Sequence, residues 1–299
     1  MLKSGDHVVF SSVTYIAVYR LLNELLKDKF GVETTIVDTT DVEKVKAAIR
    51  PNTKLIHIET PGNPTLSISD IEKLAELAHA NGALLSVDNT FASPFNQRPI
   101  ELGADFTVES LTKYINGHGD AMGGAIIGKK EYLDIIRAQS QINLGATISP
   151  FNAWLLIQGL ESLSLRIERH VANAQKIADF LENHPKVAKV NYPSLPSSPY
   201  YKLAQKYFPK GTGSIFSFEL KDGYAAARKF IDNADIFSDL ANVGDSKSLL
   251  VHPASTTHQQ LSEEAQRACG ITPGTIRISV GLENIEDLLA AVEKALATI

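Results

Sequence analysis

The sequence predicts an α/β protein that has a larger domain on a mostly parallel sheet and a smaller α+β domain after it. In the first half of the chain, short β-branched and aromatic runs alternate with amphipathic stretches at helical spacing, which is typical of parallel sheets. The length of 299 residues suits two domains, and a hydrophobic content of 44% is enough for two cores. We expect the larger domain over 1–160 and the smaller one over 161–299.

Hydrophobic periodicity and turn residues place the elements of the first domain. Strands are expected over 8–11, 34–37, 55–59, 84–87, 106–109 and 123–127, and helices over 18–26, 42–49 and 69–81. Ser69 and Glu72 have the spacing of a capping box, and Asn81-Gly82 is a typical helix end. Side chains at the carboxyl ends of these strands are candidates for a ligand site.

The second domain is expected to mix long helices with separate strands. Ser149-Pro150 is typical of a helix start, and we expect helices over 150–160 and 164–182. The remaining elements are strands over 187–190, 214–218, 248–251 and 276–280, and a last helix that Asn284 caps.

Charge and composition argue against several function classes. The 34 acidic and 29 basic residues are interspersed and give a net charge of −5, so we expect no nucleic-acid or membrane partner. The single cysteine, Cys269, rules out an intrachain disulfide, the histidines lack metal-binding spacing, and we expect no metal. Because no apolar run could span a membrane and no targeting signal is visible, we expect a cytoplasmic protein.

Four residues suggest a site for a carbonyl cofactor. Lys113 follows a predicted strand, beside the hydroxyls of Ser110 and Thr112, and Asp88 ends a neighbouring strand. Pyridoxal 5′-phosphate needs a lysine whose pKa falls on burial, a carboxylate that keeps its pyridine nitrogen protonated, and donors for its phosphate. However, a lysine in a loop is commonly solvated, and an aspartate after a strand is a common turn residue. The residues alone leave both interpretations open.

Several motifs, in order along the whole chain, resemble one enzyme family. They are Glu59-Thr60-Pro61-Gly62-Asn63-Pro64-Thr65, Val87-Asp88-Asn89-Thr90-Phe91, Ser110-Leu111-Thr112-Lys113-Tyr114, Gly117-His118-Gly119-Asp120, His252-Pro253-Ala254-Ser255 and Arg277-Ile278-Ser279-Val280-Gly281-Leu282-Glu283. They are similar to motifs of the pyridoxal-phosphate enzymes of cysteine and methionine metabolism, the trans-sulfuration enzymes. This resemblance implies the aspartate aminotransferase-like fold type I, with a cofactor-binding large domain. It also implies a pyridoxal 5′-phosphate cofactor, a small amino-acid substrate and a homo-oligomer that is a dimer of dimers.

The same resemblance implies the roles of the cofactor-binding residues. Lys113 would form the Schiff base and later move the substrate's proton, and Asp88 would pair with the pyridinium. Ser110 and Thr112 would bind the phosphate.

Four further residues match positions with roles in this family. Tyr15 would stack on the cofactor ring and assist proton transfer, although an ordinary core aromatic is the alternative. Asn63 would bond the cofactor's phenolic oxygen, although asparagine is also a common turn residue. Arg277 would bind the substrate's α-carboxylate, for which the guanidinium fork is well suited, and Asn242 would contact the substrate.

Two segments favour one branch of the family. Residues 242–248 and 148–153 resemble the O-acetylhomoserine sulfhydrylases, which implies replacement of the acetate of O-acetyl-L-homoserine by sulfide, giving L-homocysteine for methionine biosynthesis. Neighbouring branches share nearly the whole site. A methionine or cystathionine γ-lyase and a cystathionine γ-synthase therefore stay open as alternatives.

The start of the sequence departs from the family pattern. Relatives carry, before the first strand, a phosphate-binding turn and a tyrosine and an arginine that clamp the phosphate in the neighbouring subunit. This sequence begins just before Val8 and shows none of these residues. A truncated, non-catalytic subunit that associates with full-length relatives is therefore a third alternative.

Overall fold

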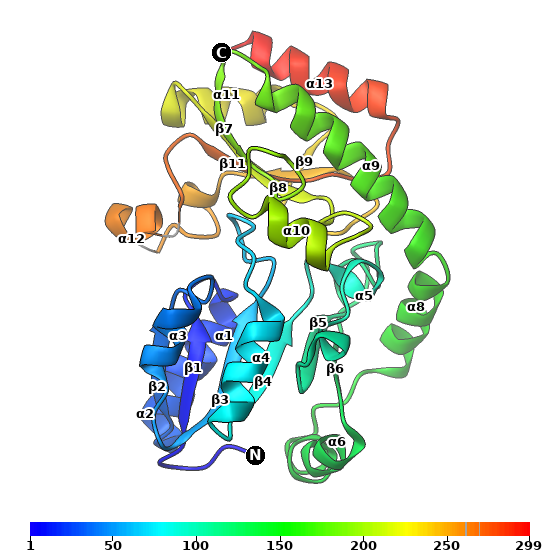
Figure 1. Ribbon diagram of the computed structural model, residues 1–299. Coiled ribbons are helices and arrows are strands. Elements are labelled where there is room, and N and C mark those ends of the chain that lie inside the picture. Colours follow the sequence, from blue (N-terminus) through cyan, green and yellow to red (C-terminus); the bar gives the residue numbers. More distant parts are fainter. Residues whose placement is uncertain (261, 269) are drawn as a thin grey trace. The chain divides into compact units, whose positions relative to one another are not determined.

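The computed structural model describes residues 1–260, 262–268 and 270–299, and Cys269 lies outside the described residues (Figure 1). The chain divides into two compact units. The first comprises Met1–Asn63, Ser67–Leu111 and Met122–Trp154, and the second comprises Pro64–Leu66, Thr112–Ala121 and Leu155–Ile299.

The first unit is built on the mostly parallel sheet that the sequence predicts. Its order is β2-β1-β3-β4-β5-β6, with β1 to β5 parallel and β6 antiparallel to β5. The strands are β1 (His7–Ser11), β2 (Glu33–Val37), β3 (Thr53–Glu59), β4 (Leu84–Asp88), β5 (Phe106–Ser110) and β6 (Gly124–Gly128). The predicted strands match these within a few residues.

Helices cover both faces of this sheet because successive strand residues point to opposite sides. Val9 of β1 belongs to a core cluster with Leu74 of α4, whereas Val8 and Phe10 pack in a second cluster with Leu22. The helices are α1 (Ile16–Arg20), which continues through a π-helical turn (Leu21–Leu26) into α2 (Lys27–Phe30), then α3 (Val42–Ala48), α4 (Ile71–Ala80), α5 (Ser93–Asn96), α6 (Lys130–Ile136) and α7 (Ile142–Leu144).

The helix predicted over 18–26 is present, but the predicted cap of α4 is wrong. Asp70, not Ser69, is the N-cap of α4 and accepts a hydrogen bond from the Lys73 N–H, because the Ser69 hydroxyl is bonded to Thr39 Oγ1 at 2.9 Å. The helix predicted over 18–26 buries only Leu22 of its leucines, since the others face outward or lie half-buried. The short helices over 130–144 were not predicted.

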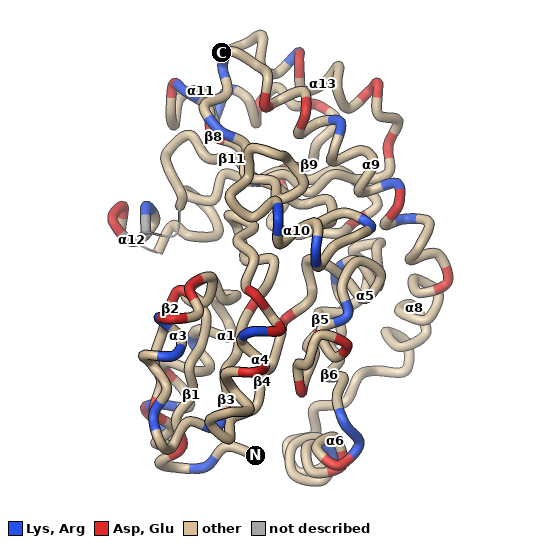
Figure 2. The backbone as a smooth tube through the Cα atoms, in the orientation of Figure 1, with Lys and Arg blue, Asp and Glu red and all other residues tan. Residues whose placement is uncertain are grey.

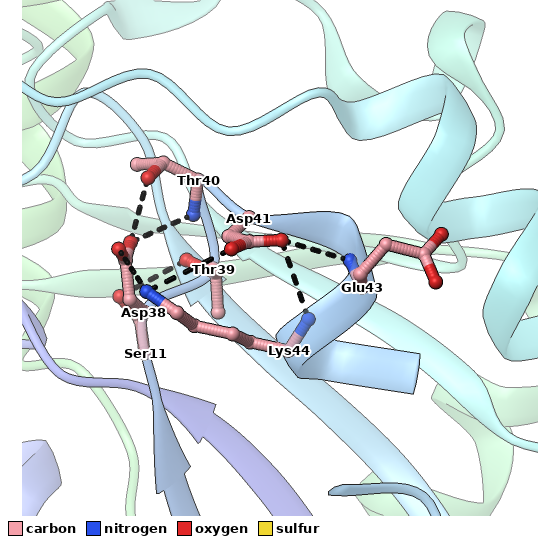
Figure 3. Close-up of polar contacts among 7 residues, drawn as sticks. All are labelled: Ser11, Asp38, Thr39, Thr40, Asp41, Glu43 and Lys44. Carbon is pink, nitrogen blue, oxygen red and sulfur yellow. Dashed lines mark hydrogen bonds and ion pairs between the residues drawn. The ribbon is translucent and has the colours of Figure 1, made fainter. Parts of the chain in front are cut away.

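The turn between β2 and α3 shows how side chains fix a helix start in this unit (Figure 3). Asp41 accepts hydrogen bonds from the N–H groups of Glu43 and Lys44, which is ordinary N-capping. The Asp38 carboxylate accepts hydrogen bonds from the backbone N–H and the hydroxyl of Thr40. The Lys44 ammonium lies 3.4 Å from the same carboxylate. The pair is exposed, so its contribution to stability is small.

The second unit is the predicted α+β domain, with helices packed against a mostly antiparallel sheet. The sheet order is β7-β8-β11-β10-β9, and only β9 and β10 are parallel. The strands are β7 (Val187–Asn191), β8 (Ile215–Leu220), β9 (Ser238–Asp239), β10 (Leu249–Val251) and β11 (Thr275–Ser279). Figure 2 shows acidic and basic residues interspersed along the elements of both units.

Long helices supply much of the core of the second unit. Ile177 of α9 and Leu288 of α13 pack in one cluster with Phe216 and Phe218 of β8. Ser149 and Asn284 accept the hydrogen bonds expected of N-caps, as predicted. The helices are α8 (Pro150–Glu161), which begins in the first unit, α9 (Leu163–Glu182), α10 (Tyr201–Tyr207), α11 (Gly223–Asn233), α12 (Glu263–Ala268) and α13 (Ile285–Ala297). None of the helices over the described ranges is long and apolar enough to cross a bilayer.

The position of the α4 cap can be tested by mutation. Asp70→Ala removes the acceptor for the first turn of α4, so the free energy of unfolding should fall by about 1 kcal/mol. Glu76→Ala, at an exposed position of the same helix, is the matched control and should change stability much less. Urea denaturation measures both variants, and equal effects would contradict the assignment of Asp70 as the cap.

Candidate active site

The carboxyl edge of the first sheet gathers four predicted site residues. Asp88 is the last residue of β4 and Ser110 the last of β5. Tyr15 follows the end of β1 by four residues, and Asn63 follows the end of β3 by four. Because these strands are parallel, the four residues share the edge at which open α/β sheets bind ligands.

Glu59, to which the sequence analysis gave no role, is hydrogen-bonded to the backbone of two of these residues, Tyr15 and Asn63. Its Oε2 accepts a hydrogen bond from the Tyr15 N–H at 2.7 Å, and its Oε1 accepts one from the Asn63 N–H at 3.2 Å. Glu59 ends β3 and is only 6% exposed. One buried carboxylate therefore fixes the backbone at both positions. The signal that could have identified it is a charged residue ending a buried strand.

A chain of hydrogen bonds connects Asp88 with Ser110. Asp88 Oδ1 accepts from the Thr90 N–H at 3.0 Å, and the Thr90 hydroxyl accepts from the Ser110 N–H at 2.9 Å. Asp88 also lies opposite Glu59 in the β3–β4 register. The first unit thus brings Tyr15, Asn63, Asp88 and Ser110 into one connected edge.

Glu109 is a second acidic residue beside this edge that the sequence analysis did not identify. It is 3% exposed, and its Oε1 accepts a hydrogen bond from Asn89 Nδ2 at 2.7 Å. Burial, together with the nearby negative charge of Asp88, raises the pKa of Glu109 to about 8 despite the Asn89 bond. The side chain is therefore a neutral carboxylic acid near pH 7.

In the second unit, Asn242 is hydrogen-bonded to the two charged candidates, Lys113 and Arg277. Lys113 Nζ donates to Asn242 Oδ1 at 2.5 Å, and Arg277 Nη2 donates to the Asn242 carbonyl at 3.4 Å. Arg277 comes from the middle of β11 and is buried. Residues far apart in the sequence thus place an amine, an amide and a guanidinium together.

The environment of Lys113 favours a neutral amine. Burial lowers the pKa of Lys113, and the positive charge of Arg277 lowers it further. The same guanidinium contributes to the lowered pKa of His258, after the larger effect of burial. A lysine held in this way is deprotonated more readily than one in water, which suits it to attack a carbonyl group or to remove a proton.

Sequence positions link the two groups of candidates. Lys113 and Thr112 lie in the second unit, and only Leu111 separates Thr112 from Ser110, the last residue of β5. The first unit therefore supplies Tyr15, Asn63, Asp88 and Ser110, and the second supplies four more residues, Thr112, Lys113, Asn242 and Arg277. Their roles toward a cofactor or substrate stay predictions.

Glu109 makes a prediction about stability and pH. A carboxyl group whose pKa is raised in the folded state stabilises the fold below its unfolded pKa, and this stabilisation is lost as the pH rises through about 8. Relative to Glu109→Gln, the free energy of unfolding of the wild type should therefore fall as the pH rises from about 4 to about 9. At about 1.4 kcal/mol per pKa unit, this decrease should reach up to about 5 kcal/mol. Denaturant unfolding across this range measures the difference, and parallel curves would refute the raised pKa.

The lowered pKa of Lys113 can be measured directly. Competitive acetylation followed by peptide mass spectrometry should give Lys113 a titration midpoint below the ordinary lysine value of about 10.4. Arg277→Leu should raise this midpoint only part of the way, because burial is the larger cause and remains. A midpoint that does not move, or that falls, in the variant would contradict the assigned role of the Arg277 charge.

Known proteins resemble this chain over almost its whole length. An L-methionine γ-lyase of Fusobacterium nucleatum is 44% identical in an alignment of 301 residues, and the alignment covers 100% of this chain and 76% of the relative. An O-acetyl-L-homoserine sulfhydrylase of Leptospira meyeri is 41% identical, with the same shares covered.

A solved structure of a further protein is also similar to this chain. A Campylobacter jejuni protein described as an O-acetylhomoserine (thiol)-lyase, with a pyridoxyl-lysine 5′-monophosphate in its chain, is 41% identical with a TM-score of 0.94, covering 99% of this chain and 78% of that one. The predicted fold type I is therefore confirmed. The model of one family, Cys/Met metabolism PLP-dependent enzyme, matches residues 1–297. This chain belongs to that family and is a pyridoxal 5′-phosphate-dependent trans-sulfuration enzyme.

Proposed function

We propose that this enzyme acts at the γ-carbon of an L-amino acid with the homoserine skeleton, and that it replaces the acetate of O-acetyl-L-homoserine by sulfide. The observation that carries this proposal is the arrangement of Lys113, Asn242 and Arg277 in the second unit. It puts an amine of lowered pKa beside a guanidinium that suits a carboxylate. An α-amino acid needs both groups, one for its Cα proton and one for its carboxylate.

The described residues fit the cofactor of the family. Its aldehyde requires a primary amine that loses its proton easily, which the pKa of Lys113 favours. Its charged pyridine nitrogen suits the Asp88 carboxylate, whose negative charge adds to the effect of burial in raising the pKa of Glu109. We propose that Ser110 and Thr112 bind its phosphate, Asn63 its phenolic oxygen, and Tyr15 its ring. When bound, the cofactor withdraws electrons from the substrate's Cα.

The chain's own residues supply binding and proton transfer in this proposal. Arg277 binds the substrate's α-carboxylate through its fork of N–H groups and so orients the Cα–H bond. The Nζ of Lys113 then takes the proton from Cα as a free amine, a form that its lowered pKa favours, and Asn242 Oδ1, which accepts a hydrogen bond from Nζ, orients the amine. Once it has passed that proton on, the same amine removes a second proton from Cβ, which allows acetate to leave from Cγ. Hydrosulfide then adds at Cγ, and the amine returns the protons to Cβ and Cα.

A γ-lyase is the second candidate. The Fusobacterium relative is named an L-methionine γ-lyase and is 44% identical to this chain, against 41% for the Leptospira sulfhydrylase. The proton transfers up to loss of the γ-substituent serve both reactions, so the residues named above serve both. The two candidates differ in the later steps, because a lyase releases the carbon skeleton and a sulfhydrylase adds a sulfur nucleophile.

A product assay distinguishes the candidates. The holoenzyme is incubated with O-acetyl-L-homoserine plus sulfide, and separately with L-methionine or L-cystathionine. We expect homocysteine and acetate from the first mixture and little 2-oxobutanoate from the others. Rapid 2-oxobutanoate formation from methionine would overturn the sulfhydrylase assignment, and cystathionine formation from an activated homoserine plus cysteine would favour a γ-synthase.

Lys113→Ala provides the control for this assay. Without the amine, proton removal at Cα should be lost, and both the visible cofactor absorbance typical of a lysine linkage and the turnover should disappear. Lys247→Ala, an exposed lysine in the same unit, should keep both. Normal turnover in Lys113→Ala would remove Lys113 from the reaction.

We also propose that the enzyme works as a homo-oligomer, a dimer of dimers. Helix α8 exposes large apolar side chains at every third position, namely Phe151, Trp154, Ile157 and Leu160. Exposed apolar side chains that recur along one element are typical of a protein interface. Light scattering after size exclusion should give the mass of four chains, and Trp154→Asp should lower it. A wild-type mass of one chain would refute this proposal.

A further inference from the structure

Helix α9 carries three buried polar side chains along one line, Arg166, His170 and Asn173. Their spacings of four and three residues place them on the same side of the helix, and each is at most 6% exposed. Figure 1 shows α9 as the long green helix of the second unit. Burial of polar groups is costly unless they are hydrogen-bonded, so their partners show what this helix holds.

Arg166 holds the backbone that follows Lys113. Its Nη1 donates to the Tyr114 carbonyl at 2.7 Å, and its Nη2 donates to the carbonyls of Ile115 at 3.3 Å and Gly159 at 2.6 Å. Charged donors make the stronger kind of hydrogen bond, and the planar guanidinium fixes the direction of each. Arg166 therefore clamps the turn that carries Lys113 to the helix pair α8 and α9.

Two glycines leave room for this clamp. Gly117 has a φ of +75°, and a Cβ there would lie 2.0 Å from Arg166 Nη1. A Cβ on Gly159 of α8 would lie 2.4 Å from the Asn116 carbonyl and 2.5 Å from that of Ile115. Only a residue without a side chain lets the turn and the guanidinium approach so closely. The position of the turn is therefore determined by contacts on two helices.

His170 and Asn173 hold a second segment, the one that follows β11. His170 Nδ1 donates to the Val280 carbonyl at 2.6 Å, and Asn173 Nδ2 donates to the carbonyls of Gly281 and Glu283, each at 3.0 Å. Burial lowers the pKa of His170 to about 4, so the ring is neutral and carries its proton on Nδ1. This segment continues directly from the strand that contains Arg277.

The two segments are also connected through Tyr114 and Ser214. Its ring packs edge-to-face on the His170 ring at 5.5 Å, and its hydroxyl is bonded to Ser214 Oγ at 2.7 Å. The Ser214 carbonyl in turn accepts from the Val280 N–H at 2.9 Å. The residue after Lys113 is thus connected by hydrogen bonds to the backbone three residues after Arg277.

We propose that the polar line of α9 positions the amine of Lys113 against the guanidinium of Arg277: Arg166 fixes the turn of the amine, and His170 and Asn173 fix the segment after the substrate-binding strand. This proposal rests on the function proposed above and assigns it three positioning residues. They act through the backbone and are not catalytic residues. Arg166 acts on the segment of Lys113, so its loss should mainly affect kcat. Asn173 acts on the segment after Arg277, so its loss should mainly affect KM.

Kinetics of two variants test this separation. Arg166→Lys keeps the charge but loses the fork, so kcat should fall about 10- to 100-fold with KM little changed, and the pH midpoint of the bound cofactor's absorbance should shift. Asn173→Leu should raise KM for the carboxylate-bearing substrate more than it lowers kcat. Arg169→Lys, at an exposed position on the same helix, is the matched control and should behave as the wild type. A purely structural role would instead lower the active fraction in both variants and leave KM and the absorbance midpoint unchanged.

Hydrogen exchange on the cofactor-free protein gives a readout that does not depend on turnover. Amides of residues 113–117 should exchange faster in Arg166→Lys than in Arg169→Lys, and those of residues 280–283 faster in Asn173→Leu. Gly159→Ala presses on the same turn from α8 and should also speed exchange at 113–117, which keeps the test available if Arg166→Lys does not fold. Exchange and kinetics equal to those of Arg169→Lys would overturn the proposal. If the wild-type protein binds no cofactor, the proposed function is overturned. Hydrogen exchange at residues 113–117 would still test whether Arg166 holds the turn that carries Lys113.

Discussion

The arrangement of Lys113 beside Arg277 is the constraint on which the account of the second unit depends. Burial penalises the charge of the amine, and the positive charge of Arg277 penalises it further, so this placement lowers the pKa of Lys113. Such a placement lasts only if other contacts hold both groups. Asn242 does so directly, since its side chain bonds the amine and its carbonyl accepts from the guanidinium. Burial of the amine, with the nearby charge of Arg277 as the smaller cause, is what makes it reactive.

In each unit, one buried charged side chain bonds to the backbone of a site segment. Glu59 accepts from the N–H groups of Tyr15 and Asn63, and Arg166 donates to the carbonyls after Lys113. Charged partners make these bonds strong, and losing one leaves a buried polar group unsatisfied at a cost of about 1–3 kcal/mol. Such contacts restrict the backbone while leaving the side chains of the site available for chemistry.

Local patterns were enough to predict most of the fold but not the site contacts. The parallel strands were predictable because apolar strand runs alternate with amphipathic helices, and Ser149 and Asn284 cap helices as their sequence neighbours suggest. The α4 cap was missed by one residue, because Ser69 bonds Thr39, thirty residues away. Lys113 and Asn242 are 129 residues apart, and no periodicity reports such a contact. The position of Lys113 after a strand made it a candidate, and resemblance to a family supplied Asn242, whereas the contacts of Glu59, Glu109 and Arg166 needed the structure.

The most direct test of this account is to locate the cofactor's covalent attachment. The purified protein is loaded with pyridoxal 5′-phosphate, reduced with borohydride, digested and examined by mass spectrometry. We predict one phosphopyridoxyl group per chain, on Lys113, because its lowered pKa favours the free amine that attacks an aldehyde. A group on another lysine, or none on a protein shown to be folded, would contradict it.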